Sequence, residues 1–422
     1  MQIGVYGTGY LGTVMAACLA DFYPPVVAFD DDTARVLALA EGDLPFYEKN
    51  LKEMVRRNLR NGHMSYCTEM APFARKSQLI YFAADSAAYI EEIALKLAAE
   101  SAPATIFVIT TPVPVGTAGR VERRLADAGR KMMVVSQPLF LTEGCAVEDF
   151  NWPDRIVLGT SSHHAVSSLK QIYRPLVMRG VPLIVTNHAT AELVREASTA
   201  FVATKISFIN ELAALCEHVN ADAVDLAMAL GLDKKIAPRC LQPGAGFGGP
   251  FVEAEMDSLA QLAAGCGVSL RILSAAREVN QSYPERVVEK LARMVEPVAG
   301  KQVGMLGLAF KPHTSSVASS SSIDLTRRLL ARGAHVRAYD PAAMPEARAE
   351  LDGDILYCET AYDAAQDADA LIVSTGWPEF RTLDFQRIKS LLRNPLIVDT
   401  KNLLDGTRLR TLGFQYIGVG RA

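Results

Sequence analysis

The chain has 422 residues, half of them hydrophobic and 21% charged, which is an ordinary globular composition. This length predicts two or three domains with a large buried core. A net charge of −4 without a basic block argues against nucleic acid as the main partner. No apolar run approaches the ~20 residues that span a membrane, and the 7 cysteines lack metal-binding or disulfide spacing. We therefore expect a cytoplasmic protein without a membrane segment or a metal site.

The N-terminal segment predicts a dinucleotide-binding turn. A short apolar strand over residues 2–6 leads into the sequence GTGYLG, and a helix follows over residues 13–20. In a GxGxxG turn the first glycine permits the tight turn, the second lets a pyrophosphate approach the backbone, and the third lets helix and strand pack closely. Free amides at the start of the helix face the phosphates. We expect the cofactor to contact the turn at Gly7, Gly9, Tyr10, Leu11 and Gly12.

The next strand ends in an acidic residue that selects the cofactor. Residues 26–29 are apolar and are followed by Asp30, at about the 20-residue spacing where a carboxylate binds the ribose hydroxyls. Because Asp30 would repel a 2′-phosphate, NAD is favoured over NADP. Arg35 on the following helix could reach the cofactor phosphate or ribose, although a solvated helix face explains it almost as well. The alternative is a Rossmann domain that kept its turn for packing and lost its cofactor.

The rest of the first domain alternates strands and helices. Apolar strands are expected over residues 78–84, 105–109 and 132–135. This alternation predicts a parallel sheet. Asp85 and Ser86 lie at the carboxyl end of the first of these strands, where doubly wound sheets bind ligands.

The middle of the chain has a different pattern. Residues 191–219 form a nearly unbroken helical pattern without Gly or Pro, which is typical of a domain spine or a dimer surface. Two more helices are expected over residues 256–266 and 270–283. Residues 244–249 carry four glycines, which would bring backbone amides close to a ligand such as phosphate. The flanking prolines and Phe247 favour a shaped loop over a flexible linker.

A second α/β pattern begins at Lys301. Its first strand is followed by a turn that is not GxGxxG, so this domain need not bind a dinucleotide. The predicted fold is α/β, with two Rossmann-like, doubly wound parallel-sheet domains joined by a long-helix central region. The expected domains are residues 1–188 for NAD, 189–290 for the helical centre and dimer contact, and 291–422 for the nucleotide-sugar.

Motifs spread along the whole chain occur in the order of one known family. The glycine turn resembles GxGYVG, residues 143–157 resemble EGxAVxDFxxPDRIV, and residues 203–211 almost repeat a known spine helix. These motifs resemble the UDP-glucose/GDP-mannose 6-dehydrogenase family. The resemblance implies an NAD-binding N-terminal domain, a spine that forms a homodimer, and a C-terminal domain that helps to bind a nucleotide-sugar, with a UDP-sugar expected first. Further matches are residues 113–117, 246–249, 306–312 and 339–341.

The resemblance also implies particular ligand contacts. Besides the turn, Asp30 and Arg35, NAD would contact Ser86 and Glu143. The nucleotide-sugar would contact the segment after the strand at 132–135, the spine helix, the glycine loop and the C-terminal domain. These implied contacts are Phe140, Leu141, Arg195, Lys205, Asn210, Leu241, Gly246, Phe247, Gly248, Gly249 and Lys311.

The residues that carry the family's chemistry are replaced. Enzymes of this family oxidise a sugar C6 alcohol to a carboxylate with two NAD; a cysteine thiolate attacks the intermediate aldehyde, and water cleaves the resulting thioester. That cysteine follows the glycine loop in the pattern GFGG-x-C, and Phe251 stands at its position. A phenyl ring cannot form a thiohemiacetal. Leu139 stands where the family has a glutamate that acts in the hydrolysis, and Pro112 replaces a water-positioning threonine.

Other positions change as well. The family's spine lysine and asparagine are Arg195 and Thr199 here, and Arg is not interchangeable with Lys at close quarters. The aspartate of the family's PKD sequence becomes Glu255, and residues 316–320 lose an arginine expected near the cofactor phosphates. Remaining candidates for an acid or base are Glu143, Arg195 and Glu255.

Three hypotheses follow from these losses. The first is a divergent oxidoreductase that binds NAD and a nucleotide-sugar but stops at a two-electron step or uses another donor. The second is a pseudoenzyme, which binds the ligands and pairs with an active paralogue through the spine helix. The third is an active UDP-sugar 6-dehydrogenase with a rearranged site. The sequence favours the first two over the third and hardly decides between them.

Overall fold

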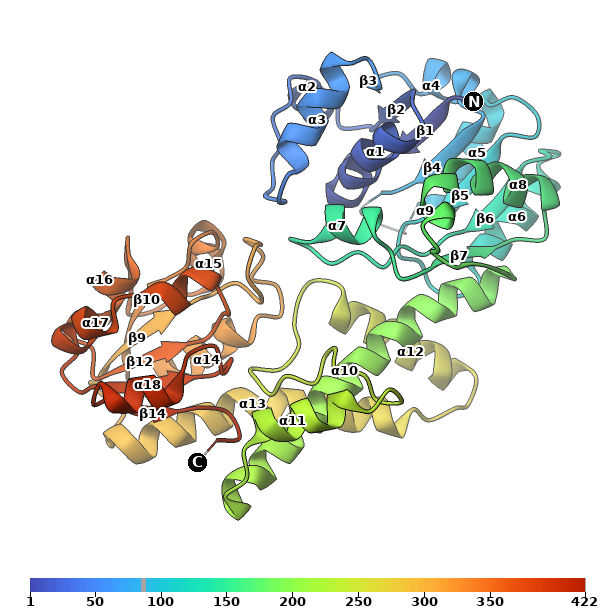
Figure 1. The fold of residues 1–422 in the computed structure, drawn as a ribbon. Coiled ribbons are helices and arrows are strands. Elements are labelled where there is room, and N and C mark those ends of the chain that lie inside the picture. Colours follow the sequence, from blue (N-terminus) through green and yellow to red (C-terminus); the bar gives the residue numbers. More distant parts are fainter. Residues whose placement is uncertain (85–88, 422) are drawn as a thin grey trace. The chain divides into compact units, whose positions relative to one another are not determined.

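The computed structural model describes residues 1–84 and 89–421 (Figure 1). Asp85 and Ser86, expected beside the cofactor, lie outside the described residues. The chain forms two compact units, Met1–Ala197 and Ser198–Ala422, which are described separately.

The first unit contains an eight-stranded sheet of order β3-β2-β1-β4-β5-β6-β7-β8. Neighbouring strands pair in parallel, except that β6 and β7 meet antiparallel at Ser136 and Gly159. β7 and β8 pair in parallel with each other, so they run opposite to the first six strands. The strands are β1 (Ile3–Tyr6), β2 (Val26–Phe29), β3 (Met64–Cys67), β4 (Leu79–Phe82), β5 (Ile106–Ile109), β6 (Met133–Ser136), β7 (Ile156–Gly159) and β8 (Leu183–Thr186).

Helices cover both faces of this sheet, which is why its central strands are apolar throughout. Along β4, Leu79 and Tyr81 belong to the core on one face, and Ile80 and Phe82 to the core on the other. The helices are α1 (Tyr10–Phe22), α2 (Thr33–Ala40), α3 (Leu51–Arg60), α4 (Met70–Lys76), α5 (Ile90–Glu100), α6 (Thr117–Asp127), α7 (Ala146–Asn151), α8 (His163–Ile172) and α9 (Arg174–Met178).

The spine helix α10 (His188–Val219) begins three residues before the predicted start, because the side chain of Asn187 accepts a hydrogen bond from the amide of Thr190. Both units contain part of this helix. By length and composition α10 could cross a membrane, with a mean hydropathy of 1.3 in its most apolar window. A core helix of a soluble protein passes the same test, so this is weak evidence for a membrane span.

Three more helices precede the second sheet: α11 (Ala223–Leu232), α12 (Val252–Gly265) and α13 (Arg271–Val295). α12 begins four residues before its predicted start. α13 continues through Pro284, where the sequence predicts its end. The continuation is stabilised by Val288 and Leu291, which are buried in the core of the second sheet.

The second sheet has six strands, paired in parallel in the order β11-β10-β9-β12-β13-β14. It too has a core on each face, so the predicted α/β fold with two doubly wound sheets and a long central helix is confirmed. Its elements are β9 (Gln302–Leu306), α14 (Ser321–Ala331), β10 (His335–Tyr339), α15 (Met344–Glu350), β11 (Ile355–Tyr357), α16 (Ala361–Ala365), β12 (Ala370–Val373), η1 (Pro378–Thr382), α17 (Phe385–Leu391), β13 (Leu396–Asp399), α18 (Gly406–Thr411) and β14 (Gln415–Ile417).

Candidate functional site

The glycine turn connects β1 to α1 in a form that requires glycine. Gly7 has φ +98°, and a Cβ there would lie 2.6 Å from the carbonyl oxygen of Ala83. A Cβ on Gly12 would lie 2.0 Å from the carbonyl oxygen of Gly7. Gly9 immediately precedes α1, whose first bond closes from the amide of Thr13 to the carbonyl of Gly9. The amides before Thr13 therefore stand at the positive end of the helix, where an anion binds.

Asp30 lies directly after β2 and contacts this turn. Its Oδ2 accepts hydrogen bonds from the amide (2.6 Å) and the hydroxyl (3.0 Å) of Thr8. Its Oδ1 accepts from the amide of Asp32 (3.0 Å) and from the guanidinium of Arg35 (3.3 Å). Asp30 and Arg35, both predicted to contact the cofactor, are thus bonded to each other.

The amides at the start of α1 suit a pyrophosphate, whereas ribose binding at Asp30 requires an exchange of hydrogen-bond partners. A carboxylate has about four acceptor positions, and the contacts of Asp30 occupy them. A ribose hydroxyl that binds Asp30 must therefore replace one of these donors. The guanidinium of Arg35 makes the longest of the four contacts, and it also pairs with Asp32 at 3.6 Å, so it keeps a partner when a ribose hydroxyl takes its place at Asp30.

Tyr10 and the segment beside Glu143 meet at a buried carboxylate. The Tyr10 hydroxyl donates to Oε2 of Glu48 (2.5 Å), and the amide of Gly144 donates to the same oxygen (2.7 Å). Burial, and then the bond to Glu48, raises the pKa of Tyr10 well above its usual range. Glu48 is absent from the predicted site because its partner Gly144 is 96 residues away in sequence.

The segment 139–141 is held by two arginines. Arg195 donates to the carbonyl of Leu139, and the guanidinium of Arg155 lies 3.8 Å from the ring centre of Phe140. The side chain of Leu139, which is predicted to replace the family's glutamate, is buried in the core, and Leu141 packs against that core. The structure thus brings together Arg195 and the segment that carries Phe140 and Leu141.

Glu192 is a second buried carboxylate, and no sequence motif marks it. It accepts hydrogen bonds from the amides of Gly116 (2.6 Å) and Ala118 (2.8 Å), at the start of α6. Burial raises the pKa of Glu192, and these two hydrogen bonds oppose the rise. The carboxylate ties the spine helix to residues 113–117, one of the motifs noted in the sequence.

In the second unit, two asparagines give the glycine loop a defined shape. Oδ1 of Asn210 accepts from the amide of Gly244 (2.8 Å). Asn280 bonds both the amide (2.9 Å) and the carbonyl (3.1 Å) of Phe247. Gly246 has φ +84°, and a Cβ there would lie 2.2 Å from Oδ1 of Asn280. Asn210 was predicted as a site residue, whereas Asn280 was not, because no motif marks it.

The end of this loop packs against the segment between β9 and α14. The amide of Gly249 donates to the carbonyl of Ala318 (3.0 Å), and a Cβ on Gly248 would lie 2.2 Å from the carbonyl oxygen of Ser319. The ammonium of Lys311 lies 5.8 Å from the ring centre of Phe310, which itself contacts Gly249. Gly248, Gly249 and Lys311 therefore all lie close to Phe310.

A lysine that the sequence analysis missed lies at the other end of the loop. A Cβ on Gly244 would lie 3.8 Å from Cδ of Lys401, which follows β13. Burial lowers the pKa of Lys401 to about 8, and the charge of Asp399 partly offsets this. An ammonium beside amide-rich backbone is suited to a phosphate.

Two predicted site residues have internal contacts. The ammonium of Lys205 donates to the carbonyls of Ile236 (3.0 Å), Ala237 (3.2 Å) and Arg239 (2.7 Å), and so holds the turn before the glycine loop. The side chain of Leu241 is buried in a small core cluster.

The residue predicted to stand at the position of the family's cysteine lies at the start of α12. Phe251 immediately precedes this helix and is 41% exposed. One turn later, Glu255 is buried, and its Oε2 accepts a hydrogen bond from the hydroxyl of Thr199 on α10 (2.5 Å). Thr199, where an asparagine is expected, and Glu255, where an aspartate is expected, are thus hydrogen-bonded to each other. Within residues 1–84 and 89–421, no group of three or more His, Cys, Asp or Glu is placed to hold a metal ion.

Comparison with known proteins gives matches along the whole chain. Residues 1–177, 189–282 and 304–406 match the NAD binding, central and UDP binding domains of the UDP-glucose/GDP-mannose dehydrogenase family. A UDP-glucose 6-dehydrogenase of Rhizobium meliloti is 36% identical over 437 residues, covering 100% of both chains. The chain belongs to the UDP-glucose/GDP-mannose dehydrogenase family. The UDP-glucose 6-dehydrogenase TuaD of Bacillus subtilis is 35% identical over 432 residues, covering 100% of this chain and 93% of the relative.

A solved structure agrees with this membership. The UDP-glucose dehydrogenase of Pyrobaculum islandicum superposes with a TM-score of 0.90 at 32% identity, covering 100% of this chain and 98% of the other. The predicted family is therefore confirmed, and so is NAD as the cofactor, since the glycine turn and Asp30 lie in the NAD binding domain. The UDP binding domain of the family supports a nucleotide-sugar as the substrate class.

Proposed function

We propose that this chain is a divergent nucleotide-sugar oxidoreductase that binds NAD and a UDP-sugar but cannot carry out the family's cysteine-dependent four-electron oxidation. The observation that carries the proposal is Phe251 at the first position before α12. Its side chain has no nucleophilic atom. Any oxidation by this protein would therefore stop after one hydride transfer.

The other replaced positions support this view, because their side chains make contacts of their own. Leu139 is part of the core, which leaves no carboxylate at that position. Thr199 and Glu255 are bonded to each other across α10 and α12. Arg195 bonds the backbone of Leu139. The remaining candidates for an acid or base in the reaction of a sugar hydroxyl are Glu143, Arg195 and Glu255.

The pseudoenzyme is the second candidate function, favoured by the number of replaced catalytic positions. In this case NAD and the sugar nucleotide would bind without turnover, and the protein would act on an active paralogue. An active UDP-sugar 6-dehydrogenase is a third candidate. It requires that Phe251 does not stand at the position of the family's cysteine, which the sequence anchors on either side, residues 246–249 and Leu259, argue against.

The first experiment is an assay of NADH formation by the purified protein with NAD and UDP-glucose, combined with analysis of the sugar product. One NADH per sugar with an aldehyde or ketone product supports a truncated oxidoreductase. Ligand binding without turnover supports the pseudoenzyme. Two NADH per uronate would overturn the proposal, because the complete reaction would then proceed without the family's cysteine.

We also propose a cytoplasmic homodimer formed through α10. Phe201, Phe208 and Leu215 recur at seven-residue spacing on this helix and are 66%, 52% and 57% exposed. An exposed apolar stripe at this spacing is typical of a helix that packs against another helix. Light scattering should give twice the chain mass for the unmodified protein and a monomer for Phe208→Glu; a monomeric unmodified protein would contradict the proposal.

A further inference from the structure

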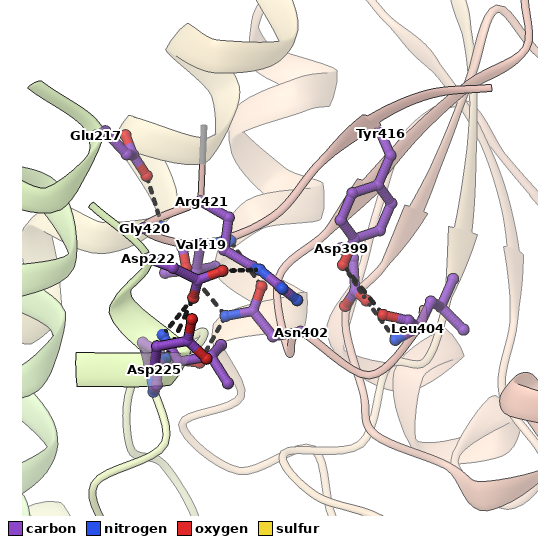
Figure 2. A network of polar contacts seen from close by, with 12 residues as sticks. Glu217, Asp222, Asp225, Asp399, Asn402, Leu404, Tyr416, Val419, Gly420 and Arg421 are labelled. Atoms are coloured by element: carbon purple, nitrogen blue, oxygen red, sulfur yellow. Dashed lines mark hydrogen bonds and ion pairs between the residues drawn. The ribbon is translucent and has the colours of Figure 1, made fainter. Parts of the chain in front are cut away.

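The end of the chain makes an unusual set of polar contacts within the second unit. After β14, residues 418–421 leave the sheet and contact α10 and α11 (Figure 2). The amide of Gly420 donates to Oε1 of Glu217 (2.7 Å), and its carbonyl accepts from the amide of Ala223 (2.8 Å). Gly420 has φ +65°, and a Cβ there would lie 2.4 Å from Cβ of Ala223. The backbone of this segment is therefore pressed against the two helices.

Arg421 completes this contact. Its Nε donates to Oδ2 of Asp222 (2.9 Å), and Oδ1 of Asp222 caps α11 by accepting from the amide of Val224 (2.8 Å). Lys290 of α13 also bonds Glu217. The segment Gly418–Arg421 thus ends at the point where three helices of the central region meet.

The same segment holds Asn402, which follows Lys401. Oδ1 of Asn402 accepts from the amide of Val419 (3.0 Å), and its Nδ2 donates to the carbonyl of Val419 (2.9 Å). This two-bond pairing fixes the carboxamide in place. Asn402 itself has φ +48°, a conformation that Asn tolerates better than most residues. The turn after β13 therefore has its shape set partly by the end of the chain.

From Asn402 the contacts reach the glycine loop. Nδ2 of Asn402 also lies 3.4 Å from the carbonyl oxygen of Pro243, at the start of the loop. The neighbouring Lys401 packs against Gly244. Asp399 stabilises the same turn by accepting from the amide of Leu404 (2.8 Å) and the hydroxyl of Tyr416 (3.0 Å) (Figure 2).

We propose that the segment Gly418–Arg421 is a positioning element for the nucleotide-sugar site, acting through Asn402 on Lys401 and the glycine loop. This inference rests on the proposed binding of a UDP-sugar at that loop. None of the residues in the segment needs to touch the ligand. When the Asp222–Arg421 ion pair is broken, the segment loosens, Asn402 loses its partner, and the loop and the lysine lose their relative placement.

The test is calorimetric titration of the full chain with UDP-glucose and, separately, with NAD. We expect Arg421→Ala and Asn402→Ala to weaken UDP-glucose binding by about fivefold, the usual consequence of one lost hydrogen bond. NAD binding, which depends on the turn in the first unit, should be unchanged and shows that the first unit of each variant is folded; an unchanged urea-denaturation midpoint shows the same for the second unit. Arg421→Lys should restore most of the affinity.

Matched controls separate positioning from general destabilisation. Arg327 forms an ion pair with Glu350 in the same unit, and Arg327→Ala should leave both affinities unchanged. Asp222→Asn removes the charge but keeps a side chain that can cap the helix. If Asp222 and Arg421 act as a unit, the double variant should bind UDP-glucose no more weakly than Arg421→Ala alone. Unchanged UDP-glucose affinity in Arg421→Ala and Asn402→Ala would overturn this inference alone, whereas absence of UDP-sugar binding to the unmodified protein would overturn the proposed function as well.

Discussion

The two sheets of this protein begin with the same turn and use it differently. Gly7 after β1 and Gly307 after β9 both have φ +98°. The amide of each donates to the carbonyl at the end of the neighbouring strand at 2.8 Å. Each neighbouring strand is followed by an aspartate, Asp30 or Asp340, that bonds the turn. The local architecture is therefore shared between a domain with a dinucleotide motif and one without it.

The difference lies in what surrounds the aspartate. The side chain of Asp30 is 13% exposed, and its longest contact is with the flexible Arg35. Asp340 is 2% exposed, and the indole of Trp377 donates to it at 3.1 Å. It also accepts hydrogen bonds from the backbone amides of Leu308, Ala309, Ala342 and Ala343.

The acid after the second strand marks a ribose site only when a ligand can reach it. Asp340 is enclosed by the protein and is committed to structure. Asp30 keeps one replaceable partner, so it can exchange an internal contact for a ribose hydroxyl.

The largest effect is expected for Asp340→Ala. It leaves several buried backbone amides and an indole without an acceptor, and each such group costs about 1–3 kcal/mol. We expect a loss of roughly 3 kcal/mol or more in the free energy of unfolding, measured by urea denaturation. Asp340→Asn retains acceptor capacity and should cost less. A stable Asp340→Ala protein would contradict the structural role of this carboxylate.

Asp30→Ala should instead act mainly on NAD. We expect about a tenfold weaker affinity by titration calorimetry, since a charged hydrogen bond to the ribose is lost. Asp32→Ala removes the cap of α2 in the same segment and is the matched control, with NAD affinity close to that of the unmodified protein. An unmodified protein that gives no heat with NAD at roughly millimolar concentration, well above usual cofactor affinities, would remove the basis of this prediction.

The pH dependence of UDP-sugar binding should follow Lys401. Its pKa is lowered to about 8, so the ammonium is present below that pH and is lost as the pH rises through it. Binding of a diphosphate should therefore weaken by several-fold between about pH 7 and pH 9, because a neutral amine offers no charge. Lys401→Arg keeps its charge and should flatten the profile. Identical profiles for the two proteins would exclude Lys401 from the site.

The smallest effect is expected for Phe251→Cys. The thiol alone should not restore uronate formation, because Leu139, Arg195 and Thr199 remain and catalytic groups of this kind act as a unit. Product analysis after long incubation is the measurement. Robust uronate production by this single variant would show that the other replacements matter little.

Features with a local cause could be predicted from the sequence. The turn at Gly7, the loop at residues 244–249 and the alternation of strands and helices are encoded by residues close together in the chain. A positive φ or a close backbone approach requires glycine whatever the rest of the fold does. The same holds for the central strands, whose apolar sequences reflect helices on both faces of a sheet.

The long-range contacts could be found only in the tertiary structure, because the residues that make them are far apart in sequence. Glu48 meets Gly144 across 96 residues, and Gly420 meets Glu217 across 203. α13 continues past Pro284 because the residues beyond it are buried against the second sheet, which outweighs the local tendency of proline to end a helix. The side chains packed around Asp30 and Asp340 likewise determine how accessible each carboxylate is to a ligand. That packing cannot be predicted from residue spacing in the sequence.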